Sequence, residues 1–142
     1  MALTMSDEGT KVIQPFELAI KSSADLATAR MAVQKMASDI GFSLTATVQI
    51  TTAVSEIVRN VLNYAGGSGG ISARKIARGG IRIEVWDNGP GIPMDVLQEV
   101  EAGTYKSRTG LGKGISGSKK LMDDFAVISF PGNTQIIMEK YL

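Results

Sequence analysis

The sequence of 142 residues contains neither cysteine nor histidine. Without cysteine there are no disulfides, no cysteine-bound zinc and no thiol nucleophile. Without histidine there are no histidine bases, no histidine metal ligands, no Ser-His-Asp triad and no phosphohistidine. Any catalysis must therefore come from carboxylates, amides, hydroxyls, lysines and backbone groups.

An excess of charge and long apolar runs are also missing. Fifteen Lys and Arg residues stand against 14 Asp and Glu residues, so bulk charge does not suggest a nucleic-acid partner. No apolar run approaches the roughly 20 residues of a membrane span, and the start of the chain (MALTMSDEGTK) lacks the basic and apolar regions of a secretory signal. We therefore expect a cytoplasmic protein with no membrane partner, built as a flexible start (residues 1–11) and one domain (residues 12–142).

The apolar pattern predicts a strand, two helices, a hairpin, two helices and a final hairpin. The expected ranges are strand 11–20, helices 24–41 and 43–64, strands 71–77 and 81–87, helices 94–103 and 115–125, and strands 126–130 and 134–142. Met31 and Val48 are among the helical residues expected to face the core. Short turns join the paired strands, so we predict an α+β fold: a two-layer sandwich with a mixed, mostly antiparallel sheet covered on one face by helices.

The second predicted helix contains VSEIVRN, in which Glu56 and Asn60 lie four residues apart and so share one helix face. Asn63 lies roughly on the same side. A carboxylate can accept a proton, and an asparagine carbonyl suits Mg²⁺ beside phosphate oxygens. Taken alone, however, the motif is more typical of a solvated helix face.

A second polar motif, DNGPGIP, follows the strand expected at residues 81–87. Asp87 stands at the end of this strand, and Gly89 and Gly91 would let the backbone approach a ligand closely. The same residues are also ordinary turn formers. A turn and a binding site are thus equally consistent with this motif.

The third motif, TGLGKGISG, places Gly110, Gly112 and Gly114 before a helix whose N-terminal amides can hold phosphates. It contains a G-x-G-x-x-G spacing, but the dinucleotide-binding loop must follow a strand and YKSRTGL is not one. A Walker A loop is excluded because Lys113 is followed by glycine rather than Ser or Thr.

In this order and spacing, the three motifs resemble the GHKL ATP-binding fold of gyrase, MutL, heat-shock chaperones and histidine kinases. The resemblance covers the chain from about Val12 onward. The small size, the missing histidine and the stretches VSEIVRN, YAGG, DNGPGIP and GLGKGISGSKKLMDDF are most similar to the serine/threonine kinases of bacterial partner-switching systems. Within these, the chain resembles the RsbT type, the switch kinase of stressosomes, with anti-sigma-factor kinases as near relatives.

This resemblance implies ATP and Mg²⁺ as cofactors and assigns roles to individual residues. Glu56 would be the general base for a Ser or Thr hydroxyl, and Asn60 would bind Mg²⁺. Asp87, helped by Thr134, would hold the adenine amino group. The implied nucleotide-binding residues are Asn60, Asn63, Asp87, Gly89, Gly91, Ile92, Thr109, Gly110, Leu111, Gly112, Lys113, Gly114 and Thr134.

The segment from Met94 to Thr109 would be a mobile lid over ATP. Three basic residues can neutralise phosphate charge, and the motif does not decide among Lys106, Arg108 and Lys113. Lys113 also departs from the family pattern, because relatives often carry an apolar residue there.

The implied function is phosphorylation of a STAS-domain antagonist protein in bacterial stress signalling, followed by activation of a phosphatase of the PP2C type. The alternatives are an anti-sigma-factor kinase that binds a sigma factor and, from another class, a nucleotide-gated binding module with little catalysis. A plain ATPase is disfavoured because no transducer domain is attached. No nucleic-acid or membrane partner is expected.

Overall fold

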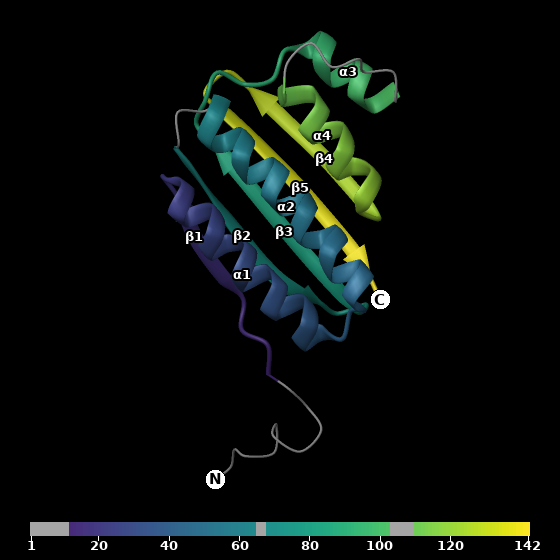
Figure 1. Cartoon of the computed structure of the whole chain (residues 1–142). Helices are drawn as coiled ribbons and strands as arrows, with labels where there is room; N and C mark the ends of the chain where they lie inside the picture. Colours follow the sequence, from purple (N-terminus) through teal and green to yellow (C-terminus); the bar gives the residue numbers. More distant parts are fainter. Residues whose placement is uncertain (1–11, 65–67, 103–109) are drawn as a thin grey trace.

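A computed structural model (Figure 1) describes residues 12–64, 68–102 and 110–142 of the chain. The elements in this range are β1 (Phe16–Ile20), α1 (Ser23–Ile40), α2 (Leu44–Tyr64), β2 (Gly69–Ile76), β3 (Gly80–Asp87), α3 (Met94–Ala102), α4 (Gly110–Leu121), β4 (Asp124–Phe130) and β5 (Asn133–Tyr141). The strands form one sheet in the order β1-β2-β3-β5-β4, and every neighbouring pair is antiparallel. Helices α1, α2 and α4 lie over one face of the sheet (Figure 1), which confirms the predicted two-layer α+β fold.

The core lies between the sheet and its helical layer, and its central part is formed by α2 against β3 and β5. Alternate residues of each strand point to the helices, so their apolar side chains meet the apolar stripe of α2. The fully or almost fully buried residues of this contact are Ile50, Val54, Ile57, Val58, Val61, Ile81, Ile83, Val85, Ile136 and Met138. Burying each such side chain stabilises the fold by about 1.5–3 kcal/mol relative to exposure. This packing fixes the C-terminal half of α2 over the middle of the sheet.

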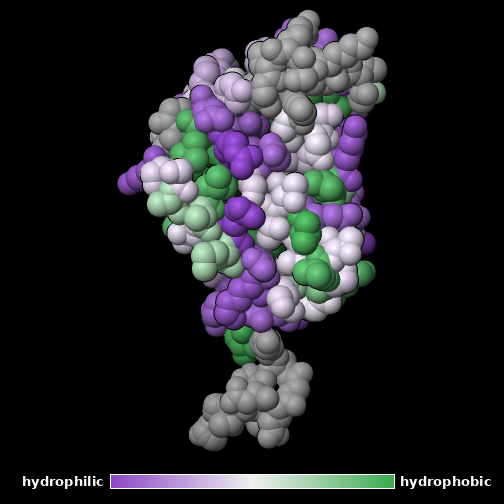
Figure 2. All heavy atoms as spheres, in the orientation of Figure 1, coloured by the Kyte–Doolittle hydropathy of each residue, from purple (hydrophilic) through white to green (hydrophobic). Residues whose placement is uncertain are grey.

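Two of the residues predicted to face the core from the first two helices do not do so. Met31 is 71% exposed and Val48 is 53% exposed. Helix α1 faces the sheet through Ala29 and Val33. Met31 lies two positions from each of them and therefore points away from that face. Figure 2 shows hydrophobic and hydrophilic patches side by side on the face that carries the helices.

Two predicted boundaries also differ. Strand β1 begins only at Phe16 rather than at residue 11. Helix α4 begins at Gly110 instead of Ile115, so the glycines expected before the helix form its first turns. Glycine has a low helix propensity, and at Gly114 the missing side chain lets α4 lie close to Glu56 and Asn60 of α2. The same helix ends at Leu121, and Asp124 already belongs to β4.

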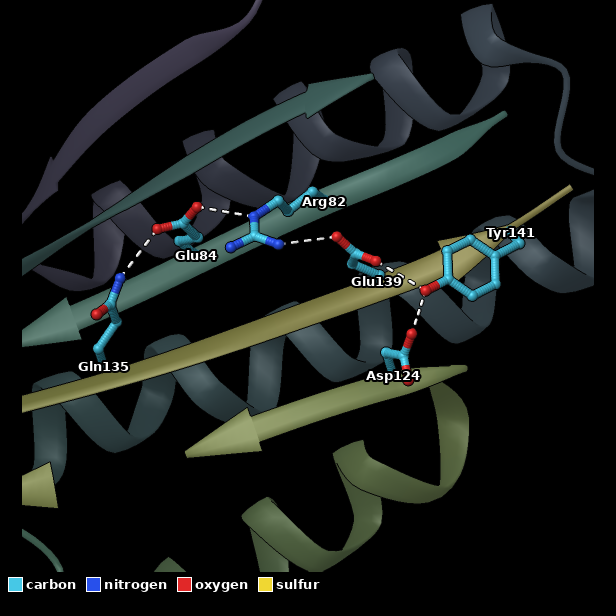
Figure 3. A network of polar contacts seen from close by, with 6 residues as sticks. All are labelled: Arg82, Glu84, Asp124, Gln135, Glu139 and Tyr141. Atoms are coloured by element: carbon cyan, nitrogen blue, oxygen red, sulfur yellow. Dashed lines mark hydrogen bonds and ion pairs between the residues drawn. The ribbon is translucent and has the colours of Figure 1, made fainter. Parts of the chain in front are cut away.

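The face of the sheet that points away from the helices carries a polar network. Figure 3 shows its members: Arg82, Glu84, Asp124, Gln135, Glu139 and Tyr141. Arg82 binds Glu84 and Glu139, each at 2.9 Å, and the Tyr141 hydroxyl lies between the carboxylates of Glu139 and Asp124. The Tyr141 hydroxyl, followed by Arg82, lowers the pKa of Glu139. No helix in the described part of the chain combines the length and the apolar character that crossing a membrane requires.

Candidate functional site

A pocket opens between the C-terminal half of α2 and the adjoining ends of β3 and β5. Its lining consists of Ile57, Asn60, Val61, Tyr64, Val85, Asp87, Pro90, Gly91, Ile92, Ile115, Thr134 and Ile136. Most of these side chains are apolar, and the polar groups are limited to an amide, a carboxylate and two hydroxyls. An apolar pocket with a few convergent polar groups is the usual form of a small-molecule site.

The carboxylate of the pocket belongs to Asp87, the last residue of β3. Its Oδ1 accepts the backbone N–H of Gly89 at 2.9 Å, which fixes the side chain at the strand end. Burial raises the pKa of Asp87, and the Gly89 N–H opposes this shift. Thr134 is the cross-strand partner of Asp87 on β5 and is 3% exposed. The pocket therefore presents a carboxylate acceptor beside a buried hydroxyl.

The loop after Asp87 is attached to the β4–β5 hairpin. Gly132 donates its N–H to the carbonyl of Gly89 at 2.9 Å. Gly91 has a φ of 88°, and a Cβ atom there would lie only 2.9 Å from the carbonyl oxygen of Phe130. A side chain at Gly91 is thus excluded by both conformation and space. This closely held backbone forms part of the pocket wall.

On the α2 side of the pocket, Asn60 and the nearby Glu56, which is not part of the lining, lie close to Gly114 of α4. A Cβ atom at Gly114 would lie 3.3 Å from Glu56 Oε2 and 3.4 Å from Asn60 Oδ1. Glu56 Oε1 also accepts a hydrogen bond of 3.1 Å from Arg59, one turn further along α2. The spacing of the motif therefore brings the carboxylate and the amide to one place, as the sequence predicted.

The Asn60 side chain has unused hydrogen-bonding capacity. Its Nδ2 atom is buried and has no hydrogen-bond partner among the residues that the structure describes. A buried polar group without a partner costs about 1–3 kcal/mol, and such groups in native proteins call for an explanation, such as a ligand. An asparagine amide at the pocket wall, beside the backbone of Gly114, fits a role in binding a phosphate-bound Mg²⁺ ion.

The predicted site residues are distributed as follows. The residues that line the same pocket are Asn60, Asp87, Gly91, Ile92 and Thr134. Gly89 supports Asp87, and Gly114 lies beside Glu56. Asn63 is exposed and lies outside the lining of this pocket.

The remaining predictions fall on the segment before and within the start of α4. Thr109 lies outside the described residues, as do Lys106 and Arg108. For Gly110, Leu111, Gly112 and Lys113 the structure describes the backbone of α4 alone. Of the predicted lid, Met94–Ala102 form α3, with Leu97 and Val100 buried, and the rest lies outside the described residues. The lid and the phosphate-binding roles stay predictions.

The sequence analysis missed the apolar residues of the lining other than Ile92, and it also missed two residues with hydroxyl groups at the site. Tyr64 lines the pocket and follows Asn60 by four residues, so the helical spacing that linked Glu56 to Asn60 also pointed to it. Ser129 accepts the backbone N–H of Ile92 at 2.8 Å, although it is 37 residues away in the sequence. No local pattern marks Ser129, because its position depends on the register of β4 against β5.

The fold and the pocket define a nucleotide-binding domain of the GHKL class. Residues 21–140 match the family of the histidine kinase-like ATPase domain. The chain is 39% identical over 127 residues to the serine/threonine-protein kinase RsbT of Bacillus subtilis (strain 168), a match that covers 87% of this chain and 93% of RsbT. It is also 35% identical over 82 residues to the C4-dicarboxylate transport sensor protein DctB of Rhizobium meliloti (strain 1021), over 55% of this chain and 13% of DctB.

Solved structures show the same fold at low sequence identity. The RsbU and RsbW domains of a Mycobacterium tuberculosis protein match with a TM-score of 0.67 and 17% identity, over 91% of this chain and 32% of that one. The SiaB–SiaC complex of Pseudomonas aeruginosa matches with a TM-score of 0.61 and 10% identity, over 92% of this chain and 90% of the matched chain. The chain therefore belongs to the histidine kinase-like ATPase domain family, in its branch of RsbT-type serine/threonine protein kinases.

Proposed function

We propose that this kinase transfers the γ-phosphate of Mg-ATP to a Ser or Thr of a STAS-domain antagonist protein. The observation that carries the proposal is the separation of two polar groups along one pocket. Asp87 and Thr134 lie at the strand ends, whereas Glu56 and Asn60 lie together on α2 beside Gly114. An adenine ring at the first group would direct the phosphates toward the second.

The strand-end group suits adenine. The Asp87 carboxylate accepts hydrogen bonds only, so it fits the exocyclic amino group of adenine and opposes the carbonyl that guanine carries at the equivalent position. The apolar side chains of Ile92 and Ile136 line the same pocket and would contact the ring faces. The Thr134 hydroxyl, buried beside Asp87, would supply a second polar contact to the base.

Asn60 would provide a protein ligand for Mg²⁺. Magnesium is usually held by one or two protein oxygens together with phosphate oxygens and water, and an amide oxygen is a suitable hard ligand. When bound, the ion neutralises charge that develops on the phosphates during transfer. In this role Oδ1 would ligate the ion, and the buried Nδ2 donor, which has no partner among the described residues, would be free to bind a phosphate oxygen.

Glu56 would take the proton of the incoming hydroxyl. As the partner's Ser or Thr oxygen bonds to the γ-phosphorus, its proton passes to the Glu56 carboxylate and ADP leaves with the electrons of the broken P–O bond. The Glu56 side chain is partly exposed and is held by Arg59, which suits a base that must meet a substrate arriving from solvent.

Phosphorylation would also release the partner. A phosphate of roughly −1.5 to −2 charge placed near Glu56 repels this carboxylate and is costly to bury. The freed kinase would then bind and activate a phosphatase of the PP2C type, all within the cytoplasm. The similarity to RsbT supports this reaction over the two alternatives, an anti-sigma-factor kinase and a nucleotide-gated binding module.

The test begins with affinity capture of partners in the presence of Mg-ATP, with mass spectrometry to identify a STAS-domain protein or a sigma factor. The purified pair should release ADP in proportion to phosphoserine or phosphothreonine on the STAS partner, and the complex should weaken afterwards. The kinase alone should hydrolyse ATP slowly. A partner that binds tightly to the Mg-ATP form and gains no phosphate would favour the binding module instead.

A further inference from the structure

Three polar side chains stand in one row across the end of the sheet. Asp87 on β3 pairs with Thr134 on β5, and Thr134 pairs with Ser129 on β4. Residues two positions along each strand share a face, so this row continues the helix-facing row that contains Val85 and Ile136. All three side chains therefore point toward the helical layer, and Ser129 stands directly behind the pocket.

The Ser129 hydroxyl makes two contacts that meet at the pocket. Its oxygen accepts the N–H of Ile92 at 2.8 Å and lies 2.8 Å from Thr134 Oγ1. A Cβ atom at Gly91 would be 3.2 Å from the same oxygen, so the loop backbone lies close against it. One hydroxyl group thus connects the loop wall of the pocket with the buried hydroxyl beside Asp87.

We propose that Ser129 is a positioning residue for adenine recognition. It holds the backbone of Ile92 at the pocket wall, and it fixes the orientation of the Thr134 hydroxyl beside Asp87. The inference rests on the proposed function, because it assigns adenine to the end of the pocket that contains Asp87. Ser129 is not part of the lining of this pocket but lines an adjoining hollow that shares Gly91 and Ile92 with it, so it acts through its two neighbours.

The chemistry of a hydroxyl explains why Ser129 controls orientation. It has one proton and two lone pairs, and the Ile92 N–H occupies one lone pair. The remaining capacity pairs with Thr134, which is buried and has little room to find another partner. Loss of this contact frees the Thr134 hydroxyl to rotate and leaves the Ile92 N–H without its acceptor. Both changes affect groups that face the base and leave the phosphate end untouched.

The experiment compares four forms of the full chain. Ser129→Ala removes both contacts, whereas Ser129→Thr keeps the hydroxyl in a residue type that suits a strand. Ser72→Ala is the matched control, because Ser72 is also a half-buried strand serine but lies on the opposite face, in the row of Glu84. Affinities for ADP and GDP with Mg²⁺ are measured by calorimetry, and melting temperatures are measured without nucleotide.

We expect Ser129→Ala to bind ADP about tenfold more weakly, with a smaller preference for ADP over GDP. Ser129→Thr should stay within about twofold of the wild type, and Ser72→Ala should be unchanged. With phosphorylation of the STAS partner as the readout, the KM for ATP should rise in Ser129→Ala while kcat stays near the wild-type value, because Glu56 lies beside Gly114 and has no contact with Ser129 or Thr134 among the described residues. A lower melting temperature alone would not produce this split.

A Ser129→Ala protein that melts earlier but keeps the wild-type preference for ADP would overturn the inference and leave the proposed function intact. A wild-type protein that binds ADP and GDP equally would overturn both, since adenine would then not be read at Asp87. If Ser129→Ala does not fold, Ser129→Cys gives the test, because it keeps the size with a weaker hydrogen-bonding group. It must show the same loss of preference for ADP.

Discussion

Asp87 should decide which base the kinase binds. In Asp87→Asn the side-chain oxygen can still accept the Gly89 N–H, so the local turn is kept. The new amide would then direct an N–H toward the adenine amino group. Both groups are hydrogen-bond donors, so no hydrogen bond can form between them and they repel each other. A hydrogen bond to a charged group contributes about 1.5–3 kcal/mol, so we expect ADP affinity to fall at least about tenfold. Calorimetry with ADP and GDP measures this, and an unchanged ADP affinity would remove Asp87 from base recognition.

The same substitution should change how stability depends on pH. Burial raises the pKa of Asp87 in the folded protein above the usual aspartate value of about 3.9. The folded state therefore holds this proton to a higher pH than the unfolded chain does. The associated stability is fully present below the unfolded pKa and is lost as the pH rises through the folded pKa. In melting curves without nucleotide, the melting temperature of Asp87→Asn should rise relative to that of the wild type as the pH increases from 4 to 7. A difference in melting temperature that does not change with pH would contradict this.

Glu56→Gln separates nucleotide binding from phosphate transfer. The glutamine keeps the shape of the side chain and can still contact Arg59 through its carbonyl oxygen, but it cannot accept the hydroxyl proton. We expect Mg-ATP affinity within about threefold of the wild type and a fall of about 10² in transfer to the partner. The measurement is the single-turnover rate on the STAS partner. Wild-type turnover would mean that another group takes the proton or that alignment alone supplies the rate.

At the level of elements, alanine substitutions at two glycines of α4 should affect nucleotide binding differently while neither lowers the stability of the fold. Alanine is a better helix former than glycine by about 0.8–1 kcal/mol. A Cβ atom at Gly114 would lie 3.3 Å from Glu56 Oε2 and 3.4 Å from Asn60 Oδ1, whereas one at Gly117 would meet no atom within 4 Å. The end of a glutamate side chain can move aside, so the fold should tolerate both substitutions.

We therefore expect Gly117→Ala and Gly114→Ala to leave the melting temperature unchanged or higher. Only Gly114→Ala should weaken Mg-ATP binding, by about tenfold, because the new methyl group occupies the space between α4 and the Asn60 amide. Thermal melts and calorimetry on both variants give the comparison. Equal affinities in the two variants would place the phosphates away from Gly114.

The elements differ in how well the sequence predicted them, and the reason is physical. The hairpin of β2 and β3 was predicted within two residues at each end, because strict alternation and a glycine turn are local signals. The start of helix α4 was predicted five residues too late because its first turns are glycine-rich, and glycine is a poor helix former. Glu56 and Asn60 were placed together because helical spacing is also local. Ser129 escaped prediction because strand register joins residues far apart in the sequence.

At the scale of the whole molecule, the sheet separates two polar regions. The pocket lies on the helix-facing side, and the network around Arg82 lies on the face that no described helix covers (Figures 1 and 3). In this network, Arg82 and Glu139 are direct cross-strand partners, and Glu84 follows Arg82 by two residues on the same face. The network therefore supports the pairing of β3 with β5 from behind, without touching the pocket.

Arg82→Ala should therefore destabilise the fold without changing nucleotide affinity. It removes two ion pairs of 2.9 Å. The carboxylates of Glu84 and Glu139, on neighbouring strands, then lack the positive guanidinium group that lies between them. We expect a loss of about 1 kcal/mol in urea unfolding. Lys35→Ala is the control, since it breaks the exposed pair with Asp39 within α1 and should cost about 0.3–0.5 kcal/mol.

The pH dependence of the Arg82→Ala effect follows from Glu139, whose pKa is lowered first by the Tyr141 hydroxyl and then by Arg82. A lowered folded pKa contributes stability that is present above the unfolded value, about 4.3 for glutamate, and that is lost as the pH falls through the folded pKa. Arg82→Ala removes the contribution of the arginine to the lowered pKa of Glu139 and keeps the contribution of Tyr141. The stability gap between wild type and variant should thus be largest near neutral pH and narrow below about pH 4. A gap that is independent of pH would mean that Arg82 acts through packing of its aliphatic stem, and a change in ADP affinity would show that the two faces of the sheet are coupled.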